Sequence, residues 1–187
     1  YVDQATLYEQ LDFEFDPECF TYALVTMPDN PLDDLIPLYS CPSDPNSGRV
    51  SDSPLGQHAP GSYPGVSGDT PTSKNGIFYV DSATRFRDVI DGLSSTIAVG
   101  ERGIPKALNI GWTLCGSTQD SFVDMQIGLI PGDANGTHTD HFWSWHTGGA
   151  HFLLGDGAVR FLSDTTDHKV LVDLSTRSGQ EVLSGDF

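Results

Sequence analysis

The distribution of hydrophobic and polar residues divides the chain into three regions with different predicted structures. Residues 1–13 carry apolar side chains near helical spacing, which predicts a short amphipathic helix that would be the end of a longer one. Residues 16–75 are rich in proline, aspartate, serine and glycine, a composition typical of turns and irregular loops. Residues 76–187 contain most of the β-prone runs, so we expect the sheet of a single domain to lie there.

Several short apolar runs in the third region predict strands. The runs are Ile77–Val80, Thr96–Glu101 and Ile110–Cys115, and the second of them has the continuous apolar character of a buried strand. These runs do not alternate with helices as a parallel α/β sheet would require. The pattern therefore predicts an α+β fold with an antiparallel sheet.

The clearest local signal is a β-hairpin over residues 150–162. Two apolar runs flank Asp156-Gly157, a dipeptide that accepts the positive φ angles of a type I′ turn. Behind the hairpin, Val170, Leu171 and Leu174 follow helical spacing, which predicts a short closing helix over residues 167–175.

Charge narrows the classes of function. The chain of 187 residues has 26 acidic and 9 basic residues, and its formal net charge is −17. A field of this sign repels phosphate groups, whose neutralisation dominates nucleic-acid affinity. We therefore expect no nucleic-acid partner and no docking on anionic lipid. No apolar run approaches the roughly 18 residues needed to cross a bilayer.

The three cysteines, Cys19, Cys41 and Cys115, leave two alternatives open. None of them has the C-x-x-C spacing of a structural zinc site. Unpaired cysteines are commonly buried as free thiols. In an oxidising compartment one disulfide would be possible, and the third cysteine would then remain odd.

Histidines concentrate in one stretch of the chain. His138, His141, His146 and His151 lie close together in sequence, with Asp133, Asp140 and Asp156 nearby. Imidazole and carboxylate groups are the usual ligands of zinc, so a metal-dependent hydrolase using this cluster is one hypothesis. The spacing does not match H-E-x-x-H, however. The alternative is that His146 fixes the entry to the hairpin structurally, where Gly148-Gly149 permits the chain to bend.

A second group of candidate ligands consists of Asp133, Asn135 and Asp140. They place hard oxygen donors at intervals around Gly136, as at the start of a Ca²⁺ loop. The glutamate that ends an EF-hand loop is absent, so a plain Asx-rich loop is the competing interpretation.

Four blocks of sequence, in order, resemble one known family. The blocks are Tyr1–Tyr8, Cys41–Pro45, Ile90–Glu101 and His146–Leu162. In the last block nine residues separate His146 from Asp156-Gly157. The whole set is similar to bacterial prepilin-like proteins with a C-terminal His-x9-Asp-Gly domain, long described as of unknown function. The motif positions are His146, Gly148, Gly149, Asp156 and Gly157.

The resemblance implies a structural role rather than an activity. Family members typically have a type IV pilin-like leader and a hydrophobic helix in front of a globular head. The implied protein is a non-catalytic, pseudopilin-like subunit of a secretion, filament or envelope assembly. It would lie in the periplasm, on the cell surface or outside the cell. Its partners would be copies of itself or other envelope proteins, and it would contact membrane only through an upstream helix that this sequence lacks.

The resemblance also bears on the cysteines and on calcium. Relatives often carry a cysteine close behind the first helix, so either Cys41 has lost its partner here or it pairs with Cys19. Closing that loop would contribute roughly 3 kcal/mol. Some pseudopilin heads hold Ca²⁺ in a loop near the C-terminal sheet, which favours the Asp133–Asp140 loop as a calcium site.

Two rival functions remain beside the structural one. The first is the metal-dependent hydrolase of the His138–His151 cluster. The second is an extracellular carbohydrate- or protein-binding module that presents the proline-rich loops of residues 40–75. Stoichiometric zinc would favour the first rival, and specific capture of a glycan or protein would favour the second.

Overall fold

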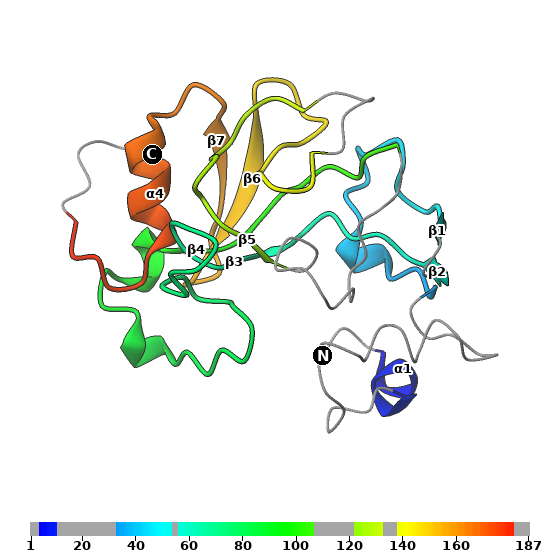
Figure 1. The fold of residues 1–187 in the computed structure, drawn as a ribbon, viewed down its shortest axis with the longest axis horizontal. Coiled ribbons are helices and arrows are strands. Elements are labelled where there is room, and N and C mark those ends of the chain that lie inside the picture. Colours follow the sequence, from blue (N-terminus) through cyan, green and yellow to red (C-terminus); the bar gives the residue numbers. More distant parts are fainter. Residues whose placement is uncertain (1–3, 11–32, 54–55, 107–121, 133–137, 182–187) are drawn as a thin grey trace.

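The computed structural model describes residues 4–10, 33–53, 56–106, 122–132 and 138–181 (Figure 1). The described elements include two α-helices, three 3₁₀ turns and a five-stranded sheet, which confirms the predicted α+β class. In chain order they are α1 (Ala5–Gln10), η1 (Pro37–Tyr39), β1 (Ser51–Ser53), β2 (Gly56–His58), β3 (Gly65–Val66), η2 (Phe86–Asp88), η3 (Leu93–Ser95), β4 (Ile97–Gly100), β5 (Phe122–Val123), β6 (Gly149–Leu154), β7 (Val159–Ser163) and α4 (His168–Ser175).

The main sheet has the strand order β5-β3-β4-β6-β7. The β3–β4, β4–β6 and β6–β7 pairs are antiparallel, whereas β3 and β5 run parallel. The sheet is therefore mixed, not wholly antiparallel as the sequence suggested. β3 and β5 have only two residues each, and strands of this length are too short to be predicted from an alternating pattern.

The β6–β7 hairpin forms as predicted, but its turn differs. Gly157 N donates to Leu154 O at 3.0 Å and Leu154 N donates to Ala158 O at 2.8 Å, which leaves a three-residue loop. Gly157 has a φ of 90°, and Asp156 does not have a positive φ. A type I′ turn needs two such residues, so the type I′ prediction is wrong. One left-handed glycine closes the loop instead. The Asp156 carboxylate accepts the N–H of Ala158 at 2.9 Å.

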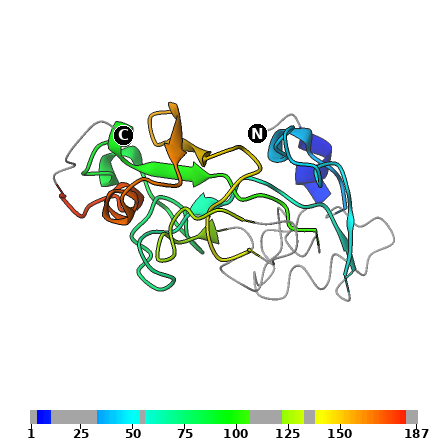
Figure 2. The same cartoon turned by 90° about the horizontal axis from the view of Figure 1, so that it is seen from above.

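The core lies between one face of the sheet and α4 (Figures 1 and 2). Alternation along β6 buries Ala150, Phe152 and Leu154. From the other side Leu171 and Leu174 of α4 join the same cluster. The helix begins where predicted, because the Asp167 side chain accepts the N–H of Lys169 at 2.7 Å.

The opposite face of the sheet carries different side chains. In β6 His151 is half-buried and Leu153 is exposed, and they alternate with the core residues. At the end of β4, a Cβ on Gly100 would lie 2.6 Å from the rings of Phe142 and Phe152. Glycine is therefore required on the core side there, and the next residue, Glu101, lies beside His151.

Other strand predictions had mixed outcomes. β4 confirms the buried strand predicted at Thr96–Glu101. Ile77–Val80 is not a strand, although Phe78 N donates to Val66 O of β3 at 3.2 Å. The predicted strand Ile110–Cys115 lies outside the described residues. α1 falls within the predicted helix of residues 1–13. The expected loop region 16–75 contains the β1–β2 hairpin and β3.

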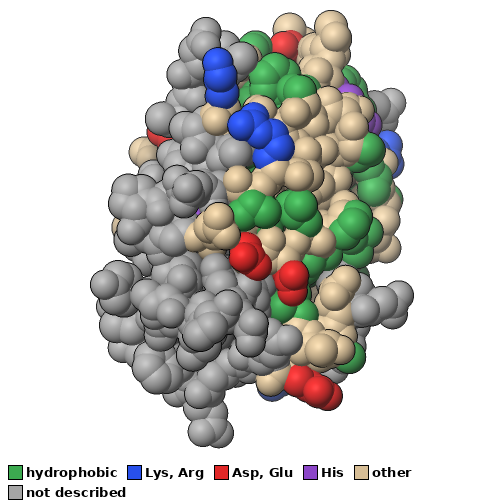
Figure 3. All heavy atoms as spheres, turned by 90° about the vertical axis from the view of Figure 1, so that its right-hand side faces the viewer, with side chains coloured by type: hydrophobic (Ala, Val, Ile, Leu, Met, Phe, Trp, Pro, Cys, Tyr) green, Lys and Arg blue, Asp and Glu red, His purple; other side chains and the backbone are tan. Residues whose placement is uncertain are grey.

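The two ends of the molecule differ in content. α4 lies at one end of the long axis, and α1 with the β1–β2 hairpin lies at the other (Figures 1 and 2). Figure 3 faces the α1 end, and its described hydrophobic side chains form separate areas among backbone and other side chains. Among the helices of the described ranges, none combines the length and apolar character that a bilayer span requires.

Candidate functional site

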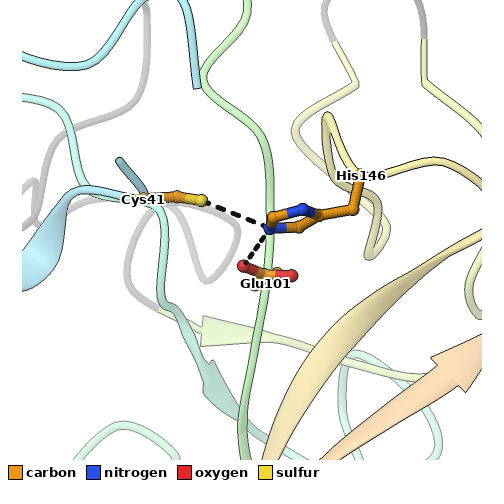
Figure 4. A group of neighbouring side chains, drawn as sticks. All are labelled: Cys41, Glu101 and His146. Atoms are coloured by element: carbon orange, nitrogen blue, oxygen red, sulfur yellow. Dashed lines mark hydrogen bonds and ion pairs between the residues drawn. The ribbon is translucent and has the colours of Figure 1, made fainter. Parts of the chain in front are cut away.

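Three side chains that are distant in sequence meet at one point: Cys41, Glu101 and His146 (Figure 4). The Cys41 Sγ lies 3.6 Å from His146 Nε2, and Glu101 Oε1 lies 3.4 Å from the same nitrogen. All three ligand-type atoms lie within 4.8 Å of one another. Cys41 and Glu101 are buried and His146 is half-buried. The arrangement thus combines a thiol, a carboxylate and an imidazole on the sheet face opposite α4.

Local hydrogen bonds fix the loop that carries Cys41. The buried Asp44 carboxylate accepts the N–H of Asn46 at 2.8 Å and the N–H of Ile104 at 2.6 Å. The N–H of Cys41 donates to Ser62 Oγ at 3.0 Å. The Cys41–Pro45 block is therefore a turn held against the chain that follows β4, and it presents the thiol toward Glu101.

Glu101 is held by His151 across the β4–β6 pair. Its Oε2 accepts the backbone N–H of His151 at 2.6 Å and lies 3.1 Å from His151 Nδ1. The side chain is 4% exposed, so these contacts compensate the cost of burying a polar group. Oε1 is left facing His146 and Cys41.

Glycines and a serine turn the chain so that His146 reaches the site. Ser144 Oγ accepts the N–H of His146 at 3.0 Å and donates to Gly149 O at 2.7 Å. Gly148 has a φ of 82°, which favours glycine. A Cβ on Gly149 would lie 2.0 Å from Leu162 O, so no side chain fits there. Two motif glycines thus serve the bend between His146 and β6.

A pocket of about 390 Å³ opens beside these three residues. Tyr63, Val99 and His151 line it together with the site residues, and Leu153 and Val159 of the hairpin complete one wall. Burial raises the pKa of Tyr63 well above its usual range, and the neighbouring Cys41 and Glu101 add to the rise. A small molecule or water could reach the cluster through this pocket.

The geometry does not match a nucleophilic triad. In a triad the histidine uses one nitrogen toward the nucleophile and the other toward the carboxylate. Here the thiol and the carboxylate both approach Nε2 of His146. Burial raises the pKa of Cys41, and the Glu101 charge raises it further, so the thiol is not activated as a thiolate. Donor atoms converging on one point are instead the arrangement that holds a metal ion.

The structure divides the four clustered histidines into two pairs. His146 and His151 lie at the site, with ring centroids 4.8 Å apart. His138 Nδ1 lies 2.9 Å from His141 Nε2, and His141 Nδ1 lies 3.1 Å from the Phe142 carbonyl. Burial lowers the pKa of His141. The hydrolase hypothesis counted all four histidines as candidate ligands. Only two of them lie at the site: His146 has a ligand-type atom there, and His151 contacts Glu101.

Other predicted site residues lie elsewhere. Asp156 is in the hairpin turn, where it bonds the backbone of Ala158. Asp140 is exposed, and Asp133 and Asn135 lie outside the described residues, so the calcium loop stays a prediction. The Cys41 thiol is free and buried. Cys19 and Cys115 also lie outside the described residues, and the Cys19–Cys41 pairing stays a prediction.

Sequence reasoning did not join Cys41, Glu101 and His146. The thiol and the imidazole are 105 positions apart, so no local spacing connects them. A signal was nevertheless present. Each of the three residues belongs to a different one of the four blocks on which the family resemblance rested. One ligand-type side chain in each of three separate blocks indicates a shared site.

The fold and the site define an α+β protein with a mixed sheet and a Cys-Glu-His cluster in which Cys41 and Glu101 are buried. Residues 1–169 match the model of a protein family described as "protein of unknown function (DUF1559)". The chain belongs to this family. No curated protein matches the chain, and no solved structure does either.

Proposed function

We propose that this chain is the head of a pseudopilin-like subunit, which acts by assembling with copies of itself in the cell envelope or outside the cell. On this proposal it is not an enzyme. Support comes from the ordered sequence blocks that resemble bacterial prepilin-like proteins. The chain also belongs to a family whose model matches residues 1–169, so the similarity extends over most of its length. The resemblance concerns architecture and location, so the proposal needs an assembly surface on the molecule.

The observation that carries the proposal is the apolar edge of the sheet. In the described part of the chain, β7 pairs with β6 on one side and forms an edge of the main sheet. Val159 and Phe161 share one face of β7 and are 62% and 47% exposed. An edge strand offers unpaired backbone groups to another chain, and exposed apolar side chains beside it favour association. A second copy of this chain would supply a matching edge.

The test is the concentration dependence of the molar mass of the full chain, measured by size-exclusion chromatography with light scattering. We expect association, and we expect Phe161→Ser to weaken it about tenfold or more, because burying a phenylalanine is worth about 1.5–3 kcal/mol. Phe86→Ser is the matched control, since Phe86 is 78% exposed on η2. A wild-type chain that stays monomeric, or equal losses in both variants, would contradict the proposal.

One observation favours a second candidate, the metal-dependent hydrolase. The group Cys41, Glu101 and His146 has donor atoms suited to a metal, and a pocket adjoins it. Turnover of ester, peptide or phosphoester probes would have to vanish in His146→Ala while folding, followed by circular dichroism, stays intact. Turnover that persists in this variant would argue against that assignment of the site.

The alternative of a binding module required the proline-rich loops of residues 40–75 to be exposed, and part of this region is not exposed. Residues 58–62 of the proline-rich region are buried. They pack behind Cys41, where Ser62 O accepts the N–H of Arg102 at 2.8 Å. This stretch therefore positions the site and is not presented to a partner.

A further inference from the structure

We propose that Cys41, Glu101 and His146 bind one zinc ion, with a fourth coordination position open to the adjoining pocket. The inference is independent of the proposed assembly role, because it rests only on the donor atoms and their surroundings. Figure 4 shows the three side chains arriving from three separate segments and pointing toward one another. A metal at their centre would connect the Cys41 loop, the end of β4 and the turn before β6.

Two of the three distances between donor atoms fit tetrahedral zinc, and the third, between the Cys41 thiol and the Glu101 carboxylate, is at most 4.8 Å. Bond lengths of about 2.3 Å to sulfur and about 2.0–2.2 Å to nitrogen and oxygen place S and N about 3.6 Å apart, and N and O about 3.4 Å apart, at tetrahedral angles. The observed Cys41 Sγ to His146 Nε2 distance is 3.6 Å. The observed His146 Nε2 to Glu101 Oε1 distance is 3.4 Å. Both agree with a shared metal centre.

Hydrogen bonding explains only part of the same arrangement, in which Tyr63 and Glu101 are also partners of the Cys41 thiol. In any one tautomer His146 Nε2 either carries a proton or accepts one, so it cannot donate to the carboxylate and accept from the thiol together. A separation of 3.4 Å is also long for a hydrogen bond between nitrogen and oxygen. A cation between the three atoms would satisfy all of them at once.

The donor set selects the class of metal. Calcium and magnesium prefer shells of oxygen atoms, whereas thiolate and imidazole favour zinc and similar transition metals. The Cys41 thiol would release its proton to solvent as zinc binds, and the resulting set of one thiolate, one imidazole and one carboxylate points to zinc. Three protein ligands leave one tetrahedral position, which water or a donor group of a bound molecule would fill from the pocket of about 390 Å³.

Surrounding contacts hold the ligands in place before a metal arrives. His151 binds Glu101 Oε2 through both its backbone N–H and its ring, so Oε1 stays directed at the centre. Ser62 anchors the backbone of Cys41, and Ser144 anchors the backbone of His146. Outer contacts of this kind orient metal ligands and tune their affinity.

The test uses the full chain, kept reduced, stripped with a chelator and titrated with Zn²⁺ and with Co²⁺. We expect one equivalent of zinc and, with cobalt, a thiolate-to-metal charge-transfer band. Cys41→Ser should abolish the band, and Glu101→Gln and His146→Gln should each weaken zinc affinity about tenfold or more. Cys115→Ser and His141→Gln are the controls, which remove a thiol and an imidazole outside the proposed ligand set.

Two outcomes would overturn the proposal. The first is the absence of the cobalt band in the reduced wild-type chain, which does not depend on any variant folding. The second is wild-type zinc affinity in Cys41→Ser, or an equal loss in Cys115→Ser. Because assembly is measured separately by light scattering, a chain that associates without binding zinc would refute this inference and leave the assembly role standing.

Discussion

At the residue scale, the site depends on a few polar side chains that are buried away from solvent. Glu101 is a buried carboxylate held by His151, and Cys41 is a buried thiol beside it. Local sequence does predict one role at this scale, the position of Asp156 in the hairpin turn. The partner of a buried polar group is set by the fold, so sequence alone did not give it.

A pH dependence of stability follows from His141. Burial lowers its pKa from 6.5, with His138 adding to the effect and the Phe142 carbonyl opposing it. The neutral ring is favoured in the folded state, so its contribution is complete above pH 6.5 and is lost as the pH falls below that value. We expect the free energy of unfolding to decrease between pH 7 and pH 5, and this decrease to be smaller in His141→Gln.

The measurement is urea unfolding at a series of pH values. His168→Gln is the control, because His168 is an exposed residue at the start of α4. If His141→Gln and the wild-type chain lose stability in parallel on acidification, the buried ring is not the cause.

At the element scale, the sequence predicted those elements whose signals are local. β4, the β6–β7 hairpin and α4 have clear apolar patterns and lie where expected. The two-residue strands β3 and β5 pair over long distances in sequence, and their composition gave no sign of it. The hairpin loop has three residues, Gly155–Gly157, and one left-handed glycine where two positive φ angles were expected.

The close approach of β6 and β7 makes Gly149 hard to replace. In Gly149→Ala the added Cβ would lie 2.0 Å from the backbone oxygen of Leu162, and no side-chain rotation relieves that contact. We expect a loss of about 1–3 kcal/mol or more in the free energy of unfolding, measured by urea titration.

Gly157→Asn is the matched control for this substitution. Gly157 has a φ of 90° but nothing within 4 Å of an added Cβ, and asparagine tolerates left-handed backbone better than other residues. Its cost should be clearly smaller. Equal costs at the two positions would contradict the contact with Leu162 as the reason that Gly149 is hard to replace.

At the scale of the whole molecule, the fold gathers the separate sequence blocks. Cys41, Glu101 and His146 come from three of the blocks that carried the resemblance, and the sheet places them together. Sequence patterns identified the blocks and the α+β class. Sequence patterns could not predict that the three side chains meet, because their meeting depends on how the Cys41 loop packs across the end of β4. The resulting account has an assembly edge at β7 and a metal site on the same face of the sheet, where Val159 of β7 also lines the adjoining pocket.

The disulfide prediction and the metal site compete for the same atom. A Cys19–Cys41 bond would remove the thiolate from the ligand set, so the two cannot coexist in one molecule. Peptide mapping of the native protein without reduction would reveal which form is present.

X-ray absorption at the zinc edge of the loaded, reduced full chain tests the central claim most directly. The account predicts one sulfur at about 2.3 Å and three nitrogen or oxygen neighbours at about 2.0–2.2 Å. A shell made only of oxygen and nitrogen, or one containing two or more sulfur atoms, would contradict it.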